Sequence, residues 1–326
     1  MRILVITHEY PPVGGGGGRV AADLSERLSA AGHEMRVITS HVKGLPRQQT
    51  LNGVEVIRLP CFRRQPFQAS FLSMAAYVLI GAGYAMNMTR SWRPDHNHVH
   101  LSVPGGVLPR HIARLTNTPY VLTAHLGDVP GGVPSKTERW FRFVYPFTHK
   151  IWKEAKRVIA VSDFTRQLAL IHYPIPISVI PNGVDLNLLD PGVIQPHETP
   201  QLVFAGRLVE QKNPLQVVRT LSLLKDLDWH CTIIGDGPLR ETLAKEIARL
   251  DLQDRFTLPG WKTPEEVIEY FKHSDILFMP SLSEGFPVSG VQASAIGLAL
   301  VVSHAGGFPE IVVQGENGFV TDAFDT

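Results

Sequence analysis

The sequence predicts an α/β protein with two Rossmann-like, doubly wound domains, each built on a parallel sheet, that face each other across a cleft. Three observations predict this fold: the length of 326 residues, the alternation of short apolar runs with helical patterns, and a break in that pattern near residue 173. A chain of this length favours about two domains over one compact core. Alternating strand and helix patterns are typical of parallel sheets in α/β units.

Short runs rich in valine, isoleucine and leucine mark the predicted strands. Their nearly continuous hydrophobicity suits strands that are covered on both faces of a sheet. In the first half they lie at residues 3–7, 35–39, 54–59, 96–100, 120–123 and 157–161. The second half repeats the plan at residues 202–205, 231–234, 256–258, 276–279, 300–303 and 319–321.

The first connection is a predicted helix, and the two halves are separated by turn signals. Val20, Leu24, Leu28 and Ala31 keep the helical period, and Gly32 follows as the residue that ends the helix. Prolines and a Pro-Asn-Gly turn punctuate residues 173–183. We therefore predict a first domain at residues 1–173 and a second at residues 174–326. Ligands of open α/β sheets bind at the carboxyl ends of the strands, which places the predicted site there.

The composition is that of an ordinary soluble protein, with 44% hydrophobic and 19% charged residues. A formal net charge of +1 gives no general attraction to nucleic acid, so no nucleic-acid partner is expected. Cys61 and Cys231 lie far apart and are interpreted as packing residues in a reducing compartment, not as a disulfide. The N-terminus runs into a strand without the apolar region of a signal peptide, so we expect a cytoplasmic location.

Residues 71–88 form an uncharged stretch flanked by Arg63, Arg64, Arg90 and Arg93. Glycines and polar residues interrupt the stretch, which falls short of the roughly 20 strongly apolar positions of a membrane span. The pattern favours a helix buried in the first domain. A helix that rests on a membrane surface, with arginines at its edges, stays open as a second interpretation, and a true span as a third.

The first strand is joined to the first helix by a loop with five consecutive glycines, Gly14 to Gly18. Without Cβ atoms, the backbone of such a loop allows a ligand to approach closely. A dinucleotide-binding loop needs a tight Gly-x-Gly-x-x-Gly turn, whereas this loop is longer and begins with two prolines. No acidic residue ends the second strand, which further disfavours an NAD-dependent oxidoreductase. A flexible linker without function is the alternative.

Two cations follow the first strand of the second half, in the motif Gly206-Arg207-Leu208-x-x-x-Lys212. Arginine grips phosphate oxygens in a bidentate manner, and lysine acts as a mobile point charge. Cations are unfavourable near the positive end of a helix dipole. Two of them at a helix start therefore indicate an anion between them.

A carboxylate precedes a later helix start in the segment Glu284-Gly285-Phe286-Pro287-Val288. Proline suits the first helical turn, because its missing N–H would be unpaired there in any case. The remaining free N–H groups of that turn are available to an oxygen ligand. A diphosphate needs both fixed positive charge and unpaired backbone N–H groups, and these two segments supply them.

Together, in this order, the motifs resemble the donor site of the family 4 retaining glycosyltransferases, which have the two-domain GT-B fold. The resemblance spans nearly the whole chain. It implies an enzyme of the hexosyltransferase type that moves a sugar from a nucleotide-diphosphate sugar to an acceptor hydroxyl with retained configuration. It further implies that protein cations replace a metal ion and that no cofactor is needed. The departing phosphate oxygen would take the acceptor proton, since the sequence shows no dedicated base.

The same resemblance implies roles for individual residues. Catalytic roles fall to His125, Glu284, Arg207 and Lys212, and acceptor binding to Asp128, although Leu126 interrupts the usual His-Gly pair. Donor binding falls to Gly15, Gly16, Arg207, Lys212, Gly235, Trp261, Glu284, Gly285, Phe286, Pro287, Val288 and Gln292.

Two of these positions carry alternatives. Gln292 stands where the family usually has a second acid that accepts ribose hydroxyls, and we interpret it as a change in nucleotide affinity, not as loss of activity. Trp261 either stacks on the base or caps a hydrophobic edge.

A metal site is not expected. His96, His98 and His100 share one face of a predicted strand, and three histidines are able to bind zinc. However, only Asp95 lies nearby to complete a ligand set.

Two further functions stay open, and the partners follow from the resemblance. A nucleotide-sugar epimerase shares the same architecture, and Gln292 makes a non-catalytic nucleotide-sugar-binding protein conceivable. The expected partners are the nucleotide sugar and a glycan or lipid acceptor, with peripheral contact at the inner face of the membrane. Family members usually continue past the segment that ends this chain, so the second domain is expected to be truncated at its C-terminus.

Overall fold

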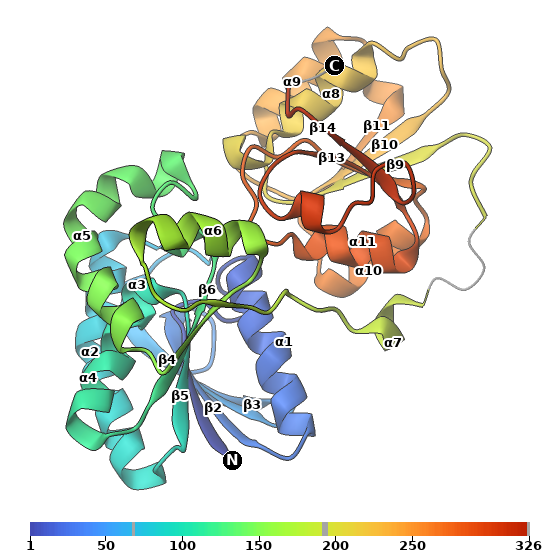
Figure 1. The fold of residues 1–326 in the computed structure, drawn as a ribbon. Coiled ribbons are helices and arrows are strands. Elements are labelled where there is room, and N and C mark those ends of the chain that lie inside the picture. The colour runs from blue at the N-terminus through green and yellow to red at the C-terminus, as the bar shows by residue number, and fades with distance from the viewer. Residues whose placement is uncertain (67–68, 191–194, 325–326) are drawn as a thin grey trace. The chain divides into compact units, whose positions relative to one another are not determined.

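The computed structural model describes residues 1–66, 69–190 and 195–324, with the side chains of residues 134–143 excepted. The chain forms two compact units, Met1–Pro181 and Asn182–Thr326 (Figure 1). The division falls later than the predicted boundary at residue 173. The reason is a short strand, Ser178–Val179, which pairs with a strand of the first sheet and keeps this segment in the first unit.

The first unit is built on an eight-stranded sheet in the order β3-β4-β2-β1-β5-β6-β7-β8. All neighbouring strands are parallel except β3 and β4. The order reverses at β1 and β5, so the sheet is doubly wound. The strands are β1 Arg2–Ile6, β2 Glu34–Val42, β3 Gln48–Leu51, β4 Val54–Arg63, β5 His96–His100, β6 Tyr120–Ala124, β7 Arg157–Ala160 and β8 Ser178–Val179.

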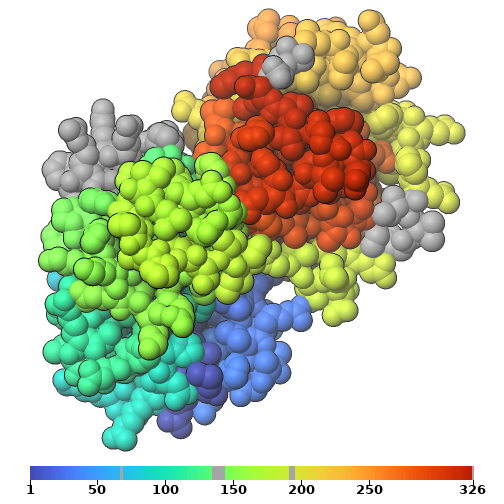
Figure 2. Space-filling model, viewed as in Figure 1, coloured from blue at the N-terminus to red at the C-terminus, as the bar shows by residue number. Residues whose placement is uncertain are grey.

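Helices cover both faces of this sheet (Figure 1). Side chains of β1 alternate: Ile3 and Val5 belong to a core with residues of α1, whereas Leu4 and Ile6 belong to a core with residues of α2. Burial on both faces explains the nearly continuous apolar strands. Figure 2 shows helix α6 at the surface of the unit. The helices are α1 Gly16–Ala30, α2 Phe71–Trp92, α3 Ser102–Gly105, α4 Val107–Thr116, α5 Pro134–Glu154 and α6 Asp163–His172.

The second unit is built on a six-stranded parallel sheet in the order β11-β10-β9-β12-β13-β14. One continuous core joins the sheet to its helices. The strands are β9 Gln201–Ala205, β10 His230–Ile234, β11 Phe256–Gly260, β12 Ile276–Met279, β13 Ala299–Ser303 and β14 Gly318–Thr321. The helices are α7 Leu186–Leu189, α8 Pro214–Ser222, α9 Arg240–Arg249, α10 Pro264–Lys272 and α11 Val288–Ile296.

The predicted α/β class is confirmed, and each predicted strand overlaps an observed one. The sequence did not predict β3 or β8. The residues of β3 are largely polar and lie at the sheet edge, and β8 is only 2 residues long. Gly32 adopts a φ of +88° directly after α1, as predicted for the residue that ends this helix. Cys61 and Cys231 are buried and form no disulfide.

The uncharged stretch forms α2, and one face of this helix packs on the sheet. Tyr77 is buried, and its hydroxyl donates to the carbonyl oxygen of Ile38 at 2.9 Å. Over the most apolar window, however, only 28% is buried, which differs from a fully buried core helix. Within the described residues, α2 is the one helix whose length and composition would allow it to cross a membrane.

A substitution of Tyr173 would test whether the segment after α6 packs into the core of the first unit. Its ring stacks on Trp152 with centroids 4.2 Å apart, and its hydroxyl lies 2.9 Å from that of Thr148. Tyr173→Ala should lower the free energy of unfolding of the first unit by about 3–5 kcal/mol, the usual range for a buried aromatic residue. Ile171→Ala, at a side chain 73% exposed, should change it by no more than about 0.5 kcal/mol. Denaturant-dependent hydrogen exchange at β7 measures both, and equal effects would contradict this packing.

Candidate active site

In the first unit, Glu9 fixes the glycine loop that follows β1. One carboxylate oxygen accepts a hydrogen bond from the backbone N–H of Gly15 at 3.0 Å. The other lies 3.7 Å from His8 Nε2 and 3.9 Å from Arg63 Nη2. In this structure a carboxylate therefore contacts both the start of the loop and the helix start that follows it.

The five glycines of this loop serve different purposes. A Cβ at Gly14, where φ is +104°, would lie 2.4 Å from Glu9 Cβ, so glycine is needed there, and a Cβ at Gly18 would be tightly packed 3.0 Å from Glu9. A Cβ at Gly15 or Gly16 would meet nothing within 4 Å. Gly15 is the N-cap of α1, where backbone N–H groups lack intrahelical partners. The predicted ligand-binding pair thus lies beside open space at a helix start.

His125 follows β6 and lies against this helix start. A Cβ at Gly17 would contact its ring at 3.5 Å. Its Nε2 lies 3.4 Å from Nδ1 of His100, at the end of the neighbouring strand β5. His98, on the same face of β5, has its ring 4.5 Å from that of His100 and pairs with the Thr123 hydroxyl at 2.8 Å.

Burial keeps these imidazoles neutral. It lowers the pKa of His98 and of His125 to about 4, and the pKa of His100 falls well below its usual value. The neighbouring histidines add to the effect at His98 and His100, whereas the Glu9 carboxylate opposes it at His125. Near neutral pH, His125 is an uncharged hydrogen-bonding group.

Asp128 is 3% exposed, and the protein itself occupies both carboxylate oxygens. One accepts from the backbone N–H and the hydroxyl of Ser102, at 2.6 and 2.8 Å, and the other from the backbone N–H of His125 at 2.9 Å. Burial raises its pKa to about 6, although these hydrogen bonds oppose the rise. In this structure Asp128 orients the segment that carries His125, and its predicted acceptor contact stays a prediction.

In the second unit, the loops after β9 and β12 meet through an ion pair. Lys212 Nζ lies 2.5 Å from Glu284 Oε1, and the Glu284 side chain is 7% exposed. Next to it, the side-chain amide of Gln211 donates to the carbonyl oxygen of Ser283 at 2.9 Å. Arg207 is half-buried, and its guanidinium forms no hydrogen bond or ion pair with the residues that the structure describes. Two of the predicted phosphate and sugar contacts are thus in direct contact with each other.

Glycines allow the loops around this pair to touch. A Cβ at Gly235, where φ is +141°, would lie 1.9 Å from the Gly206 carbonyl oxygen. One at Gly306, where φ is +63°, would lie 1.6 Å from the Glu284 carbonyl oxygen. Gly307 approaches Gly285 in the same way. Any other residue at these positions would push apart the loops that carry the predicted site.

The segment from Gly285 to Val288 leads into α11. Pro287 is the N-cap, not a residue of the first turn as predicted, because its ψ of 108° is extended and the helix begins at Val288. The carbonyl oxygen of Phe286 accepts from the side chain of Asn182 at 3.0 Å. The first N–H groups of α11 lack intrahelical partners, as those of any helix do.

Gln292 and Trp261 lie farther along the predicted donor site. Gln292 is half-buried one turn after Val288, on the same helix face, because residues four apart are neighbours on a helix. Trp261 follows β11 and is 54% exposed. Its exposed ring is compatible with base stacking, and neither role is tested.

Metal ligands do not cluster in the described residues: no group of three or more His, Cys, Asp or Glu side chains is placed to hold a metal ion. His98 and His100 do share one strand face, as predicted, and their rings are in contact.

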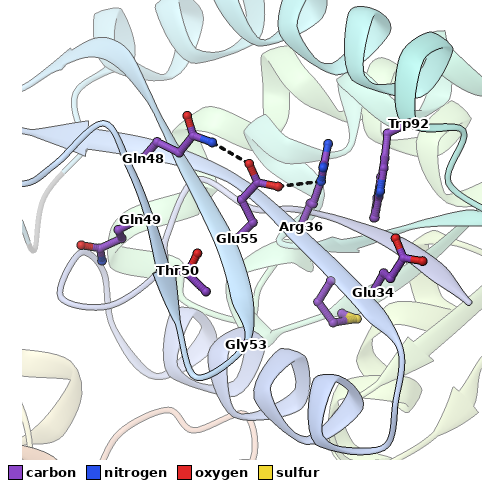
Figure 3. Close-up of a pocket in the computed structure, with 9 residues that line it drawn as sticks. Glu34, Arg36, Gln48, Gln49, Thr50, Gly53, Glu55 and Trp92 are labelled. Carbon is purple, nitrogen blue, oxygen red and sulfur yellow. Dashed lines mark hydrogen bonds and ion pairs between the residues drawn. The ribbon is translucent and has the colours of Figure 1, made fainter.

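A cavity of about 340 Å³ lies in the first unit, away from all predicted site residues (Figure 3). It is lined by residues at the amino ends of β2 and β4, by β3, and by Trp92 of α2. Two of its charged groups pair with each other: Arg36 Nε lies 2.6 Å from Glu55, and the Arg36 guanidinium lies over the Trp92 ring. Parallel α/β sheets bind ligands at the opposite, carboxyl ends of their strands.

Comparison with protein families decides the assignment. The model described as Glycosyltransferase Family 4 matches residues 14–188, more than half of the chain. The chain belongs to glycosyltransferase family 4. The model described as Glycosyl transferases group 1 matches residues 191–326, so this glycosyltransferase carries family motifs in both units.

Relatives of the glycosyltransferase extend over its whole length. It is 26% identical over 98% of its chain to an uncharacterized glycosyltransferase of Methanocaldococcus jannaschii, covering 84% of that protein. It is equally similar to a glycogen synthase of Mycobacterium tuberculosis, of which it covers 81%. A UDP-Gal:alpha-D-GlcNAc-diphosphoundecaprenol alpha-1,3-galactosyltransferase of Escherichia coli is 29% identical over 71% of the chain and 63% of that protein.

Solved structures confirm the GT-B fold. Sucrose-phosphate synthase of Thermosynechococcus elongatus matches 99% of the chain with a TM-score of 0.84 and 21% identity, over 86% of that structure. Anabaena HepE, solved with UDP and glucose, matches 99% with a TM-score of 0.75 and 20% identity, over 87% of its chain.

The sequence did not indicate several residues that shape the site. Glu9 and His100 both contact predicted site residues. The position of Glu9 shortly before the glycines was a usable signal for its role. No signal in the sequence indicated that His100 contacts His125. Gly306 and Gly307 follow β13, and a double glycine at the carboxyl end of a strand was a usable signal. Asn182 is far from Phe286 in sequence, so only the fold brings them together.

The buried histidines predict an acid-labile first unit. In the unfolded chain imidazoles titrate near 6.5, whereas His8, His98 and His125 have a pKa of about 4 in the fold. Between pH 6.5 and 4 the unfolded chain binds more protons, so the free energy of unfolding falls as the pH falls. Asp128, with its pKa raised to about 6, acts in the opposite direction, but one carboxyl opposes several imidazoles.

Hydrogen exchange of the full chain between pH 7 and 4, corrected for intrinsic rates, measures this loss in β5 and β6. His98→Gln should flatten the profile, because it removes one titrating group and keeps a hydrogen-bonding amide near Thr123. A first unit whose stability is unchanged over this range would contradict the buried neutral state.

Proposed function

We propose that this glycosyltransferase moves a sugar from a nucleotide-diphosphate sugar to an acceptor hydroxyl with retained configuration and without a protein-bound metal. The observation that carries the proposal is the 2.5 Å contact between Lys212 and Glu284, beside an arginine whose guanidinium has no partner in the described structure. Cations at the carboxyl edge of a parallel sheet, near a helix start, fit a diphosphate.

The ion pair also orients the lysine. The ammonium group carries three N–H donors, and the contact with Glu284 Oε1 uses one of them. The other two are free to bind phosphate oxygens. Arg207, on the same loop after β9, adds a planar guanidinium that can donate two hydrogen bonds to one phosphate.

In the proposed reaction, the bond from the anomeric carbon to the leaving phosphate oxygen breaks, and a bond to the acceptor oxygen forms on the same face of the sugar. Arg207, Lys212 and the start of α11 stabilise the charge that develops on the diphosphate. The departing phosphate oxygen takes the acceptor proton. Within the second unit, Glu284 positions the sugar. The neutral state of His125 in the first unit is compatible with its predicted catalytic role.

The acceptor is proposed to be a glycan or a lipid-linked sugar. The Escherichia coli relative is named for a UDP-Gal donor and a diphosphoundecaprenol-linked acceptor, which supports this class. For such a substrate the enzyme would work in the cytoplasm at the inner face of the membrane. A free epimerised sugar formed without acceptor would instead assign it to the epimerases.

Lys212→Ala should lower turnover by about 10²-fold or more, because one preorganised charge stabiliser is lost. Glu284 is buried and would be left unpaired, so the melting temperature of Lys212→Ala is measured beside its turnover to separate that destabilisation from the chemistry. Lys245→Ala is the matched control, since Lys245 forms an exposed pair with Glu241 at 2.7 Å. Sugar transfer is measured with a panel of nucleotide sugars and acceptors. Near-normal turnover of Lys212→Ala would refute the role.

The stereochemistry and the metal requirement are tested on the wild-type enzyme. Proton NMR of the first-formed product should show the anomeric configuration of the donor. Transfer should continue at an unchanged rate in excess EDTA, because protein cations neutralise the leaving group. An inverted product would remove the retaining mechanism, and loss of transfer that Mg²⁺ or Mn²⁺ restores would remove the metal-free one.

A further inference from the structure

Helix α2 presents an apolar face to solvent. Leu72 and Leu79 are 66% and 78% exposed, and they lie on one line along the helix with Gly83 and Arg90, because residues seven or four apart share a face. Phe71, at 68% exposed, lies at the helix start. No charged residue occurs between Arg64 and Arg90. An outer helix face of a soluble domain normally carries charged residues.

The neighbouring helices extend this surface. Helix α4 packs beside α2, and α5 lies next to α4 on the same side of the sheet (Figure 1). Leu115 of α4 and Phe147 of α5 are 64% and 67% exposed. Lys150 and Lys153 of α5 are exposed beside them. We call this surface the α2 face; it consists of Phe71, Leu72, Leu79, Gly83, Arg90, Leu115, Phe147, Lys150 and Lys153.

The charge around the α2 face has one sign. Arg64, Arg90, Arg93 and Arg114 are exposed around this face, and the sequence holds a single acid, Asp95, between residues 56 and 127. Arg58 and Arg63 are buried and donate to backbone carbonyl oxygens within the first unit, so they do not contribute to the surface charge. Asp95 accepts a hydrogen bond from the Arg2 backbone at 2.8 Å. On α5, Glu154 is neutralised by Arg110 and Arg114 at 2.9 and 2.7 Å. The whole chain has a formal net charge of only +1, so this region is distinguished by its scarcity of acids and not by an excess of cations.

We propose that the α2 face docks on an anionic membrane surface, with the apolar side chains of α2 inserted among the lipids and the surrounding cations on the headgroups. Exposed apolar residues rimmed by lysine and arginine are the pattern of helices that lie in a membrane interface. Anionic lipids attract such basic segments.

The charge pattern favours a membrane over a second copy of the chain. A two-fold dimer through this face would bring the same surface patch together from both subunits, so arginine would meet arginine. A bilayer with anionic lipids supplies negative charge wherever a cation falls. This docking extends the proposed function by naming the partner of the first unit, and it does not depend on which sugar is transferred.

The test is sedimentation of the full chain with vesicles of phosphatidylcholine alone and of phosphatidylcholine mixed with phosphatidylglycerol. The wild-type protein should sediment with the mixed vesicles and should not sediment with the neutral ones. Added salt should weaken the binding to the mixed vesicles. Leu72→Glu/Leu79→Glu should reduce binding about tenfold or more, since it removes inserted apolar groups and adds charge repulsion. Leu223→Glu, at a residue 63% exposed in the second unit, is the matched control and should bind as the wild type does.

A second variant, Arg90→Gln/Arg93→Gln, keeps the apolar face and should weaken binding to the mixed vesicles and make that binding less sensitive to salt. Equal binding of wild type and Leu72→Glu/Leu79→Glu would overturn the proposal, as would absence of lipid binding by the wild type. Self-association that the double glutamate variant abolishes, without lipid binding, would assign the face to a second copy. No donor or acceptor is present, so failure here and failure of sugar transfer are separate results.

Discussion

The Lys212–Glu284 ion pair is the interaction on which the second unit's site depends. It joins the loops after two neighbouring strands, β9 and β12, at 2.5 Å. Breaking a buried pair by removing one partner costs about 3–5 kcal/mol, because it leaves an uncompensated charge. Gly306 permits the close approach that holds the Glu284 backbone in place. The pair therefore positions both a cation and a carboxylate where sheets of this class bind ligands.

The first unit prepares its edge differently. Two carboxylates hold its backbone in place: the half-buried Glu9 holds the glycine loop, and the buried Asp128 holds the segment that begins at His125. Burial of the neighbouring histidines lowers their pKa and keeps them uncharged near neutral pH. The second unit thus carries fixed charges at its own sheet edge, and the first carries neutral hydrogen-bonding groups and bare backbone at its own.

Much of this could be predicted from the sequence, because the signals were local. Buried strands are continuous apolar runs, and the motifs around Arg207 and Glu284 follow such runs directly. The contact between Lys212 and Glu284 joins residues 72 positions apart, so only the fold reveals it. The sequence also did not show which face of α2 packs on the sheet and which face is exposed. An uncharged helix carries no polar stripe that marks its outer face. The edge strand β3 was missed because its residues are polar.

The most direct test of the central claim is a crystal structure of the enzyme with a nucleoside diphosphate, chosen from UDP, ADP and GDP by the largest rise in melting temperature. The account predicts diphosphate oxygens within about 3 Å of the Arg207 guanidinium and of Lys212 Nζ, with the backbone of residues 285–288 beside them. A diphosphate bound elsewhere, with these two side chains remote from it, would contradict the account.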